Sequence, residues 1–235
     1  ALVNFISLAD DEKVTSILQV PKADKAKNTF LMLITAEGTA KKMSSESFKD
    51  VRRSGIIAIR LDKGDSLQTA LAVEKGDEII MATSGGQAVR FKESDIREMG
   101  RTAGGVRAMK LKTRSTSSGQ AGEQVIGVDV ITKEFQQADF LVMSENGLGK
   151  KTALKEYKVQ KRGGSGIKTA KVTPKTGKLI IGKLVKGEAE MIAISKKGQV
   201  IRVELDTIPS LGRQTQGVTI MKMRAGDGIA SVTFL

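Results

Sequence analysis

The stretch EIIMATSGGQAVRFKESDIREMGRTAGGVRAMKL, residues 78–111, recurs three more times in altered form and decides the fold. Its counterparts are FLMLITAEGTAKKMSSESFKDVRRSGIIAIRL (30–61), DFLVMSENGLGKKTALKEYKVQKRGGSGIKTAKV (139–172) and EMIAISKKGQVIRVELDTIPSLGRQTQGVTIMKM (190–223). Each copy runs from an apolar segment to a first glycine, and then through a polar segment to a second glycine. The first glycines are Gly38, Gly86, Gly147 and Gly198. The second glycines are Gly55, Gly105, Gly166 and Gly217.

Each copy has the pattern of β-structure. The turns AEGT, SGGQ, ENGL and KKGQ are hairpin signals, and a β-branched residue follows every second glycine. A period near 50 residues with about four short strands is typical of propeller-like arrays, in which neighbouring blades bury one another's faces. The sequence therefore predicts an all-β fold with one domain over 1–235.

We expect four full repeats, with blades at about 29–73, 77–131, 138–185 and 189–235. The opening residues 1–20 match the back half of a repeat, 55–73, and predict a partial N-terminal blade. We therefore expect the chain to be a piece of a longer protein. The polar segment RSTSSGQAGE at 114–123 lengthens one interval and has the composition of a flexible surface loop.

The composition favours a polyanionic partner. Lys and Arg number 39 against 26 Asp and Glu, which gives a formal net charge of +13, and the sequence pI is about 9.9. Such a balance points first to nucleic acid and second to an anionic membrane surface. The chain has no cysteine and no histidine, which excludes disulfides, thiolate metal sites and histidine general bases. No apolar run approaches the roughly 18 residues of a membrane span.

Positive charges follow the repeat in three sets. The first set comes four residues after each first glycine and is Lys42, Arg90, Lys151 and Arg202. The second set comes five residues after each second glycine and is Arg60, Lys110, Lys171 and Lys222. The third set comes shortly before each second glycine and is Arg53, Arg101, Arg162 and Arg213. Because strand side chains alternate between faces, a base flanked by apolar neighbours is expected to face outward, and the sets predict a basic belt around the particle.

The third repeat is the most basic. Residues 138–185 hold eleven Lys or Arg against three Asp or Glu. Its glycines fit neither a Walker loop nor a dinucleotide-binding fingerprint, because the spacing fails. Instead they are expected to let backbone N–H groups approach the sugar–phosphate backbone of DNA. The further predicted DNA contacts are Arg107, Lys158, Lys161, Gly163, Gly164, Gly166 and Lys168.

Catalysis by this chain is not expected. Tyr157 is the only tyrosine, but it occupies a position that is apolar in every repeat, as Phe48, Ile96 and Ile208 show, so we expect it in the core. The acidic residues form no recurrent pair suited to metal or acid–base chemistry. Aromatic residues make up 3% of the chain, which argues against stacking platforms and favours duplex DNA over single strands.

Several long motifs carry a family resemblance. VRFKESDIREMGRTAGGVRAMKL, KKTALKEY, GRQTQGV and DEKVTSILQV together resemble the C-terminal domain of the DNA gyrase A subunit, and the topoisomerase IV A subunit is a similar alternative. The resemblance implies a β-pinwheel of four-stranded antiparallel blades whose basic rim binds, bends and wraps duplex DNA. QKRGGSG at 160–166 is similar to the family heptapeptide QRRGGKG at Gln160, Arg162, Gly163, Gly164 and Gly166. The resemblance implies that Gln160 also contacts DNA.

The resemblance also implies partners and a setting. These are double-stranded DNA, the rest of the gyrase A subunit and the gyrase B subunit, in the bacterial cytoplasm at the nucleoid. It implies a monomeric domain with no membrane contact, no metal and no cofactor of its own, while ATP and magnesium act elsewhere in the holoenzyme. The competing hypothesis is a protein-interaction propeller whose basic rim meets an acidic partner, although the Trp-Asp signature of the common interaction propellers is missing.

Overall fold

The computed structural model describes residues 14–18, 29–48, 51, 55–112 and 122–235. The first sheet contains β1 (Thr29–Thr35), β2 (Thr39–Ser44), β3 (Leu67–Glu74) and β6 (Val106–Arg107). The second sheet contains β4 (Glu78–Thr83), β5 (Gln87–Lys92), β7 (Val125–Ile131) and β10 (Ile167–Lys168). These sheets are antiparallel throughout.

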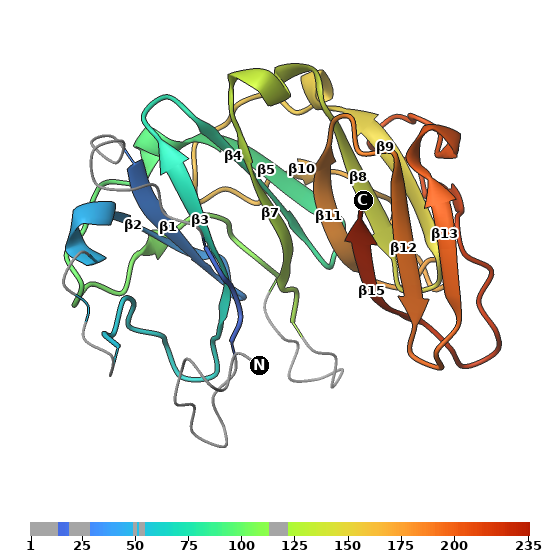
Figure 1. Ribbon diagram of the computed structural model, residues 1–235, viewed down its shortest axis with the longest axis horizontal. Coiled ribbons are helices and arrows are strands. Elements are labelled where there is room, and N and C mark those ends of the chain that lie inside the picture. The colour runs from blue at the N-terminus through green and yellow to red at the C-terminus, as the bar shows by residue number, and fades with distance from the viewer. Residues whose placement is uncertain (1–13, 19–28, 49–50, 52–54, 113–121) are drawn as a thin grey trace.

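The third and fourth sheets repeat this plan. The third contains β8 (Asp139–Ser144), β9 (Leu148–Ala153), β11 (Leu179–Val185) and β14 (Val218–Thr219). The fourth contains β12 (Glu190–Ser195), β13 (Val200–Glu204) and β15 (Ile229–Phe234). Short 3-10 turns follow the strands: η3 (Ser45–Phe48), η4 (Glu93–Asp95), η5 (Lys133–Gln137), η6 (Leu154–Glu156) and η7 (Leu205–Thr207). The four sheets stand side by side in an arc, so the predicted all-β pinwheel is confirmed (Figure 1).

Each of the first three sheets is completed by a strand from the following repeat. β6, β10 and β14 follow the second glycines, and they pair with the outer strand of the preceding repeat, for example Ala40 with Val106. We call them the swapped strands. The carbonyl of the first glycine anchors each one: Gly38 O accepts from the N–H groups of Ala108, at 2.9 Å, and Met109, at 3.2 Å. This exchange explains why both glycines recur in every repeat.

The fourth sheet has three strands where four were expected. The described residues include no repeat after β15, so no swapped strand pairs with the outer edge of β13. Val200 on this edge is consequently 59% exposed. In the first repeat the segment that corresponds to a swapped strand, Ile56–Ile57, likewise pairs with no strand, and Ile57 is 80% exposed.

The core lies between successive sheets. One buried cluster joins the first and second sheets around Met32 and Phe91. A second joins the second and third around Ile80 and Phe140, and a third joins the third and fourth around Met143. Among the described residues no helix is long and apolar enough to cross a membrane. The interlocked sheets therefore hold the swapped strands at fixed positions along one edge of the arc.

Candidate nucleic-acid interface

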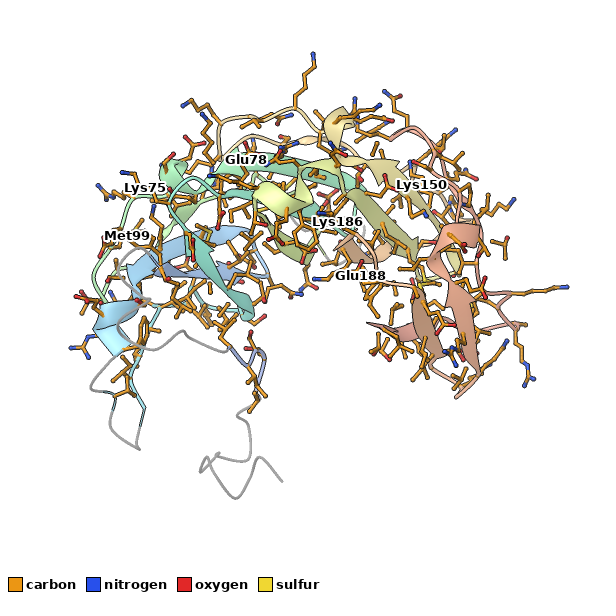
Figure 2. The ribbon with its side chains drawn as sticks, turned by 45° about the horizontal axis from the view of Figure 1, so that its top comes forward. Lys75, Glu78, Met99, Lys150, Lys186 and Glu188 are labelled. Carbon is orange, nitrogen blue, oxygen red and sulfur yellow. The ribbon has the colours of Figure 1, made fainter. Side chains whose placement is uncertain are left out.

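Exposed cations gather at the outer edge of the sheets, where the swapped strands lie. Arg107 on β6 and Lys168 on β10 are exposed. The second predicted set, Arg60, Lys110, Lys171 and Lys222, is exposed as well. Met109 and Met221, which precede two of these lysines, are buried, so the predicted alternation of inward apolar and outward basic side chains is confirmed there. Figure 2 shows basic side chains projecting from the outer side of the arch.

The segments before the second glycines cross this outer edge. We call 97–105, 158–166 and 209–217 the rim loops. In the middle rim loop the N–H of Gln160 donates to Arg90 O at 2.7 Å, and the N–H of Gly163 donates to Ala108 O at 2.6 Å. Lys158 and Lys161 on this loop are exposed, and the side chain of Lys161 is 93% accessible although its Nζ lies 3.5 Å from Asp95. Backbone pairing thus fixes the loop while its lysines face solvent.

Two of the three glycines in the middle rim loop, Gly163 and Gly166, serve the blade junction. The N–H of Gly163 is already bonded to Ala108 O, so the expectation that it approaches an anion is wrong. Gly166 has φ of +71°, and a Cβ there would lie 2.3 Å from Ala88 O, so this position requires glycine for close packing against β5. Gly164 is exposed, and a Cβ there would meet no atom closer than 4.0 Å. Of the three glycines, Gly164 is therefore the one that leaves room for a ligand.

The first predicted set faces inward in the first two sheets. Lys42 is 6% exposed, and its Nζ bonds both the carboxylate and the carbonyl of Glu93 on η4. Arg90 is 9% exposed; its Nε donates to Glu78 Oε2 at 2.6 Å and its NH1 to Leu154 O at 3.3 Å. The expectation that Lys42 and Arg90 face outward is therefore wrong. The reason is that the turn of the following repeat covers that face of the strand.

The two remaining members of the first set, which lie toward the C-terminal end of the arc, are more exposed. Lys151 is half-buried and its Nζ donates to Leu205 O at 2.7 Å. Arg202 is exposed, because no following repeat covers it in the described chain, and its Nε donates to Glu190 Oε2 at 2.7 Å. This set therefore contributes mainly to the junctions between blades.

The described members of the third set differ in their exposure to solvent. Arg101 is exposed, whereas Arg162 and Arg213 are half-buried. Arg162 donates from Nε to Asp95 O at 2.8 Å and from NH1 to Arg107 O at 3.0 Å. Arg213 repeats the second contact on Lys168 O at 3.1 Å. Each of these arginines thus fixes the backbone of a neighbouring exposed cation, and Arg53 lies outside the described residues.

Tyr157 is a core residue, as predicted. It is 1% exposed, its ring packs edge-on against Phe140 at 5.6 Å between centroids, and its hydroxyl lies 2.6 Å from Thr169 Oγ1. Burial raises the pKa of Tyr157 to about 12, against a weaker lowering by the Thr169 hydrogen bond. A phenol that is buried and harder to ionise is poorly suited to nucleophilic attack.

Two further cations were missed by sequence reasoning. Lys41 and Lys150 are both 0% exposed and lie beneath the first and third rim loops. Only an indirect feature of the sequence pointed to their burial. The rim-loop residue that faces each lysine is a glycine, Gly100 or Gly212, whereas the middle rim loop has Lys161 at that position. No group of three or more acidic side chains within the described part of the chain is placed to hold a metal ion.

Comparison with known proteins identifies the family. The family described as "DNA gyrase C-terminal domain, beta-propeller" matches residues 29–74, 77–116, 138–185 and 189–234. The DNA gyrase A subunit of Staphylococcus epidermidis is 32% identical over 231 residues, which cover 98% of this chain and 25% of that protein. The DNA gyrase A subunit of Kosmotoga olearia is 35% identical over 232 residues, covering 98% and 27%. The chain thus spans about a quarter of the length of the curated relatives it matches.

Solved structures agree with this assignment. A structure of the DNA gyrase A C-terminal domain superimposes with a TM-score of 0.80 at 26% identity, covering 99% of this chain and 74% of the other. The C-terminal domain of DNA topoisomerase IV superimposes with a TM-score of 0.85 at 20% identity, covering 100% and 69%, and shows the shared fold. Four matched repeats, the interlocked sheets and both sequence relatives lead to one conclusion: the chain belongs to the family of DNA gyrase C-terminal domains.

Proposed function

We propose that this chain binds, bends and wraps double-stranded DNA as part of the A subunit of a gyrase. The observation that carries the proposal is the recurrence of exposed cations along the outer edge of consecutive sheets. These rim cations are Arg101, Arg107, Lys110, Lys158, Lys161, Lys168, Lys171 and Lys222. Because the edge is curved, a duplex that follows it is bent (Figure 1).

The physical balance favours binding through phosphates. Bending a site of 20–30 base pairs by 40–90° costs on the order of 1–6 kcal/mol. Cations that neutralise phosphates release counterions, so about eight contacts give a slope of roughly −7 in a plot of log affinity against log salt. Such contacts position the duplex and carry little sequence information, so binding is expected to depend strongly on salt and weakly on sequence.

In the whole enzyme the wrapped segment is presented for strand passage. The remainder of the gyrase A subunit and the gyrase B subunit are the proposed partners, and ATP and magnesium act there to drive negative supercoiling. This chain acts in the cytoplasm at the nucleoid, supplies no catalytic group and needs no cofactor of its own. Gyrase is preferred over topoisomerase IV because the sequence relatives at 32–35% identity are gyrase A subunits.

The testing experiment is topological. A nicked plasmid is sealed by ligase with the chain bound, the protein is removed, and the linking-number distribution is measured. We expect a shift that grows with protein concentration, and a smaller shift for the double variant Arg107→Gln, Lys168→Gln. The matched control is Lys133→Gln, an exposed lysine at the start of η5 beyond the end of β7. Retarded plasmid with an unchanged linking number would show binding without wrapping and would refute the wrapping step.

A further inference from the structure

The third residue after each first glycine differs between repeats in a regular way. It is lysine in the first and third repeats, Lys41 and Lys150, and aliphatic in the second and fourth, Val89 and Ile201. Lys41 on β2 and Lys150 on β9 are both fully buried. Lysine is almost never fully buried unless its ammonium has partners, so each must be held by specific contacts.

Three of the four contacts are with backbone carbonyls of the rim loops, and the fourth is with the carbonyl of Ala58 in the first repeat. Nζ of Lys150 donates to Gly212 O at 2.5 Å and to Arg213 O at 2.8 Å. Nζ of Lys41 donates to Arg101 O and to Ala58 O, both at 2.6 Å. Arg101 and Arg213 occupy the same position in their repeats, so the two lysines make the same contact at two separate junctions.

Burial shifts the pKa of both amines in the same direction. It lowers the pKa of Lys41. It also lowers the pKa of Lys150 to about 8, with nearby Glu156 opposing and Arg213 adding to the effect. Keeping a charged ammonium at either buried position therefore costs free energy. The hydrogen bonds to the backbone carbonyls offset that cost, so the geometry of these contacts matters.

The middle junction has no such lysine. Val89 lies where a lysine would reach the loop, and the loop itself carries Lys161 in place of the glycine. That loop is fixed from its own side, since Arg162 donates to Asp95 O and Arg107 O. The middle rim loop is thus held by its own arginine, whereas the third rim loop is held by Lys150 in addition to the equivalent contact of Arg213 with Lys168 O.

We propose that Lys41 and Lys150 are positioning residues for DNA, which hold the first and third rim loops in the conformation that meets the duplex. This inference rests on the proposed function. Neither lysine contacts solvent, so neither reaches a phosphate. Lys150 acts through the loop: it holds the Arg213 backbone, and the Arg213 side chain donates to the carbonyl of Lys168, an exposed rim cation. A loop ordered in advance avoids the entropy of ordering it on binding.

The rate of trypsin cleavage measures how accessible the backbone of each rim loop is. Cleavage after Arg213 requires access to the Arg213 carbonyl, which Lys150 occupies. We expect Lys150→Met to accelerate cleavage at Arg213–Gln214 by about tenfold or more, because the carbonyl loses a charged donor. Cleavage at Arg162–Gly163 in the same sample is the internal reference and is expected not to change. Lys41→Met should act in the same way at Arg101–Thr102, and it is the independent test if Lys150→Met does not fold.

The salt dependence of DNA binding separates positioning from contact. We expect Lys150→Met to weaken duplex binding about three- to tenfold at every salt concentration, with an unchanged slope, because loop ordering is lost while no phosphate contact is. Lys110→Met, which removes an exposed rim cation, should lower the slope by about 0.9. Met143→Ala, in the core between the third and fourth sheets, controls for general destabilisation and should leave affinity unchanged below its unfolding temperature.

The outcomes of the cleavage and binding experiments distinguish a positioning role from a phosphate contact. A parallel loss of affinity together with faster cleavage at Arg213 supports the positioning role. A reduced slope for Lys150→Met would mean that this lysine contacts phosphate, and faster cleavage without weaker binding would mean that it only stabilises the loop; either result overturns the inference. If the unsubstituted chain fails to bind DNA, the proposed function fails and so does the role in DNA binding, while the cleavage rates still show whether the lysines hold the loops.

Discussion

Replacing Gly166 with alanine tests whether the glycines of the middle rim loop serve the blade junction. The backbone there has φ of +71°, and the left-handed conformation costs an L-residue about 1–2 kcal/mol. The new Cβ would lie 2.3 Å from Ala88 O and 2.8 Å from Met109 Cε, and overpacking of this kind costs about 1–3 kcal/mol. Gly166→Ala is therefore expected to destabilise the fold by about 2–5 kcal/mol.

Gly164→Ala is the matched control two residues away. A Cβ there would meet no atom closer than 4.0 Å, and φ is not in the left-handed region, so stability should not change measurably. Chemical unfolding followed by circular dichroism measures both variants, and plasmid retardation measures binding. If the glycines instead approach DNA, Gly164→Ala should weaken binding while Gly166→Ala leaves stability intact. A stable Gly166→Ala variant would refute the interpretation that this glycine is required by strand exchange.

Three further predictions concern the charged residues. Arg90→Met should destabilise the fold by about 3–5 kcal/mol in urea unfolding, because it leaves the Glu78 carboxylate without its partner at a covered position, whereas Arg202→Met, at the exposed equivalent position, should have little effect. The stability of the unsubstituted chain should rise by about 1–2 kcal/mol between pH 8 and 10 relative to that of Lys150→Met. The pKa of Lys150 is about 8 in the folded state against 10.5 in the unfolded chain, so the unfolded chain binds more protons in that window. A flat difference between the two pH profiles would contradict this. Lys168→Gln should lower the salt slope of DNA binding by about 0.9, and an unchanged slope in a filter-binding titration would remove Lys168 from the interface.

The repeat itself was readable from the sequence. Paired glycines, hairpin turns and the β-branched residues after the second glycine predicted the sheets, because each feature reflects a local rule of strand and turn geometry. Tyr157 was placed in the core for the same reason, since its position is apolar in the other repeats. The exposed bases after Met109 and Met221 followed from simple alternation, although the structure places them just beyond the ends of β6 and β14.

The inward orientation of the Lys42 and Arg90 side chains could not be predicted from local rules of strand and turn geometry. Alternation says that two faces of a strand differ, but not which of them another part of the chain covers. Here the cover is a 3-10 turn of the following repeat, which supplies Glu93 to Lys42 from 51 residues further along and the Leu154 carbonyl to Arg90 from 64 residues further along. Strand exchange is a non-local event, and a single repeat read by itself contains no sign of it. The buried position of Lys150 escaped prediction for the same reason, because its carbonyl partners belong to the next repeat.

Strand exchange also sets the order in which the chain can fold as it is made. The first sheet's own last strand, β3, ends at Glu74, but its fourth strand begins only at Val106. At 5–20 residues per second the ribosome needs roughly 2–6 s to supply the missing strand, and until then the outer edge of β2 has unpaired backbone groups. Each later repeat completes its predecessor and exposes a new edge of its own. Each sheet can therefore be completed only after the following repeat has been synthesised. At every stage of synthesis the most recently made sheet has an unpaired edge.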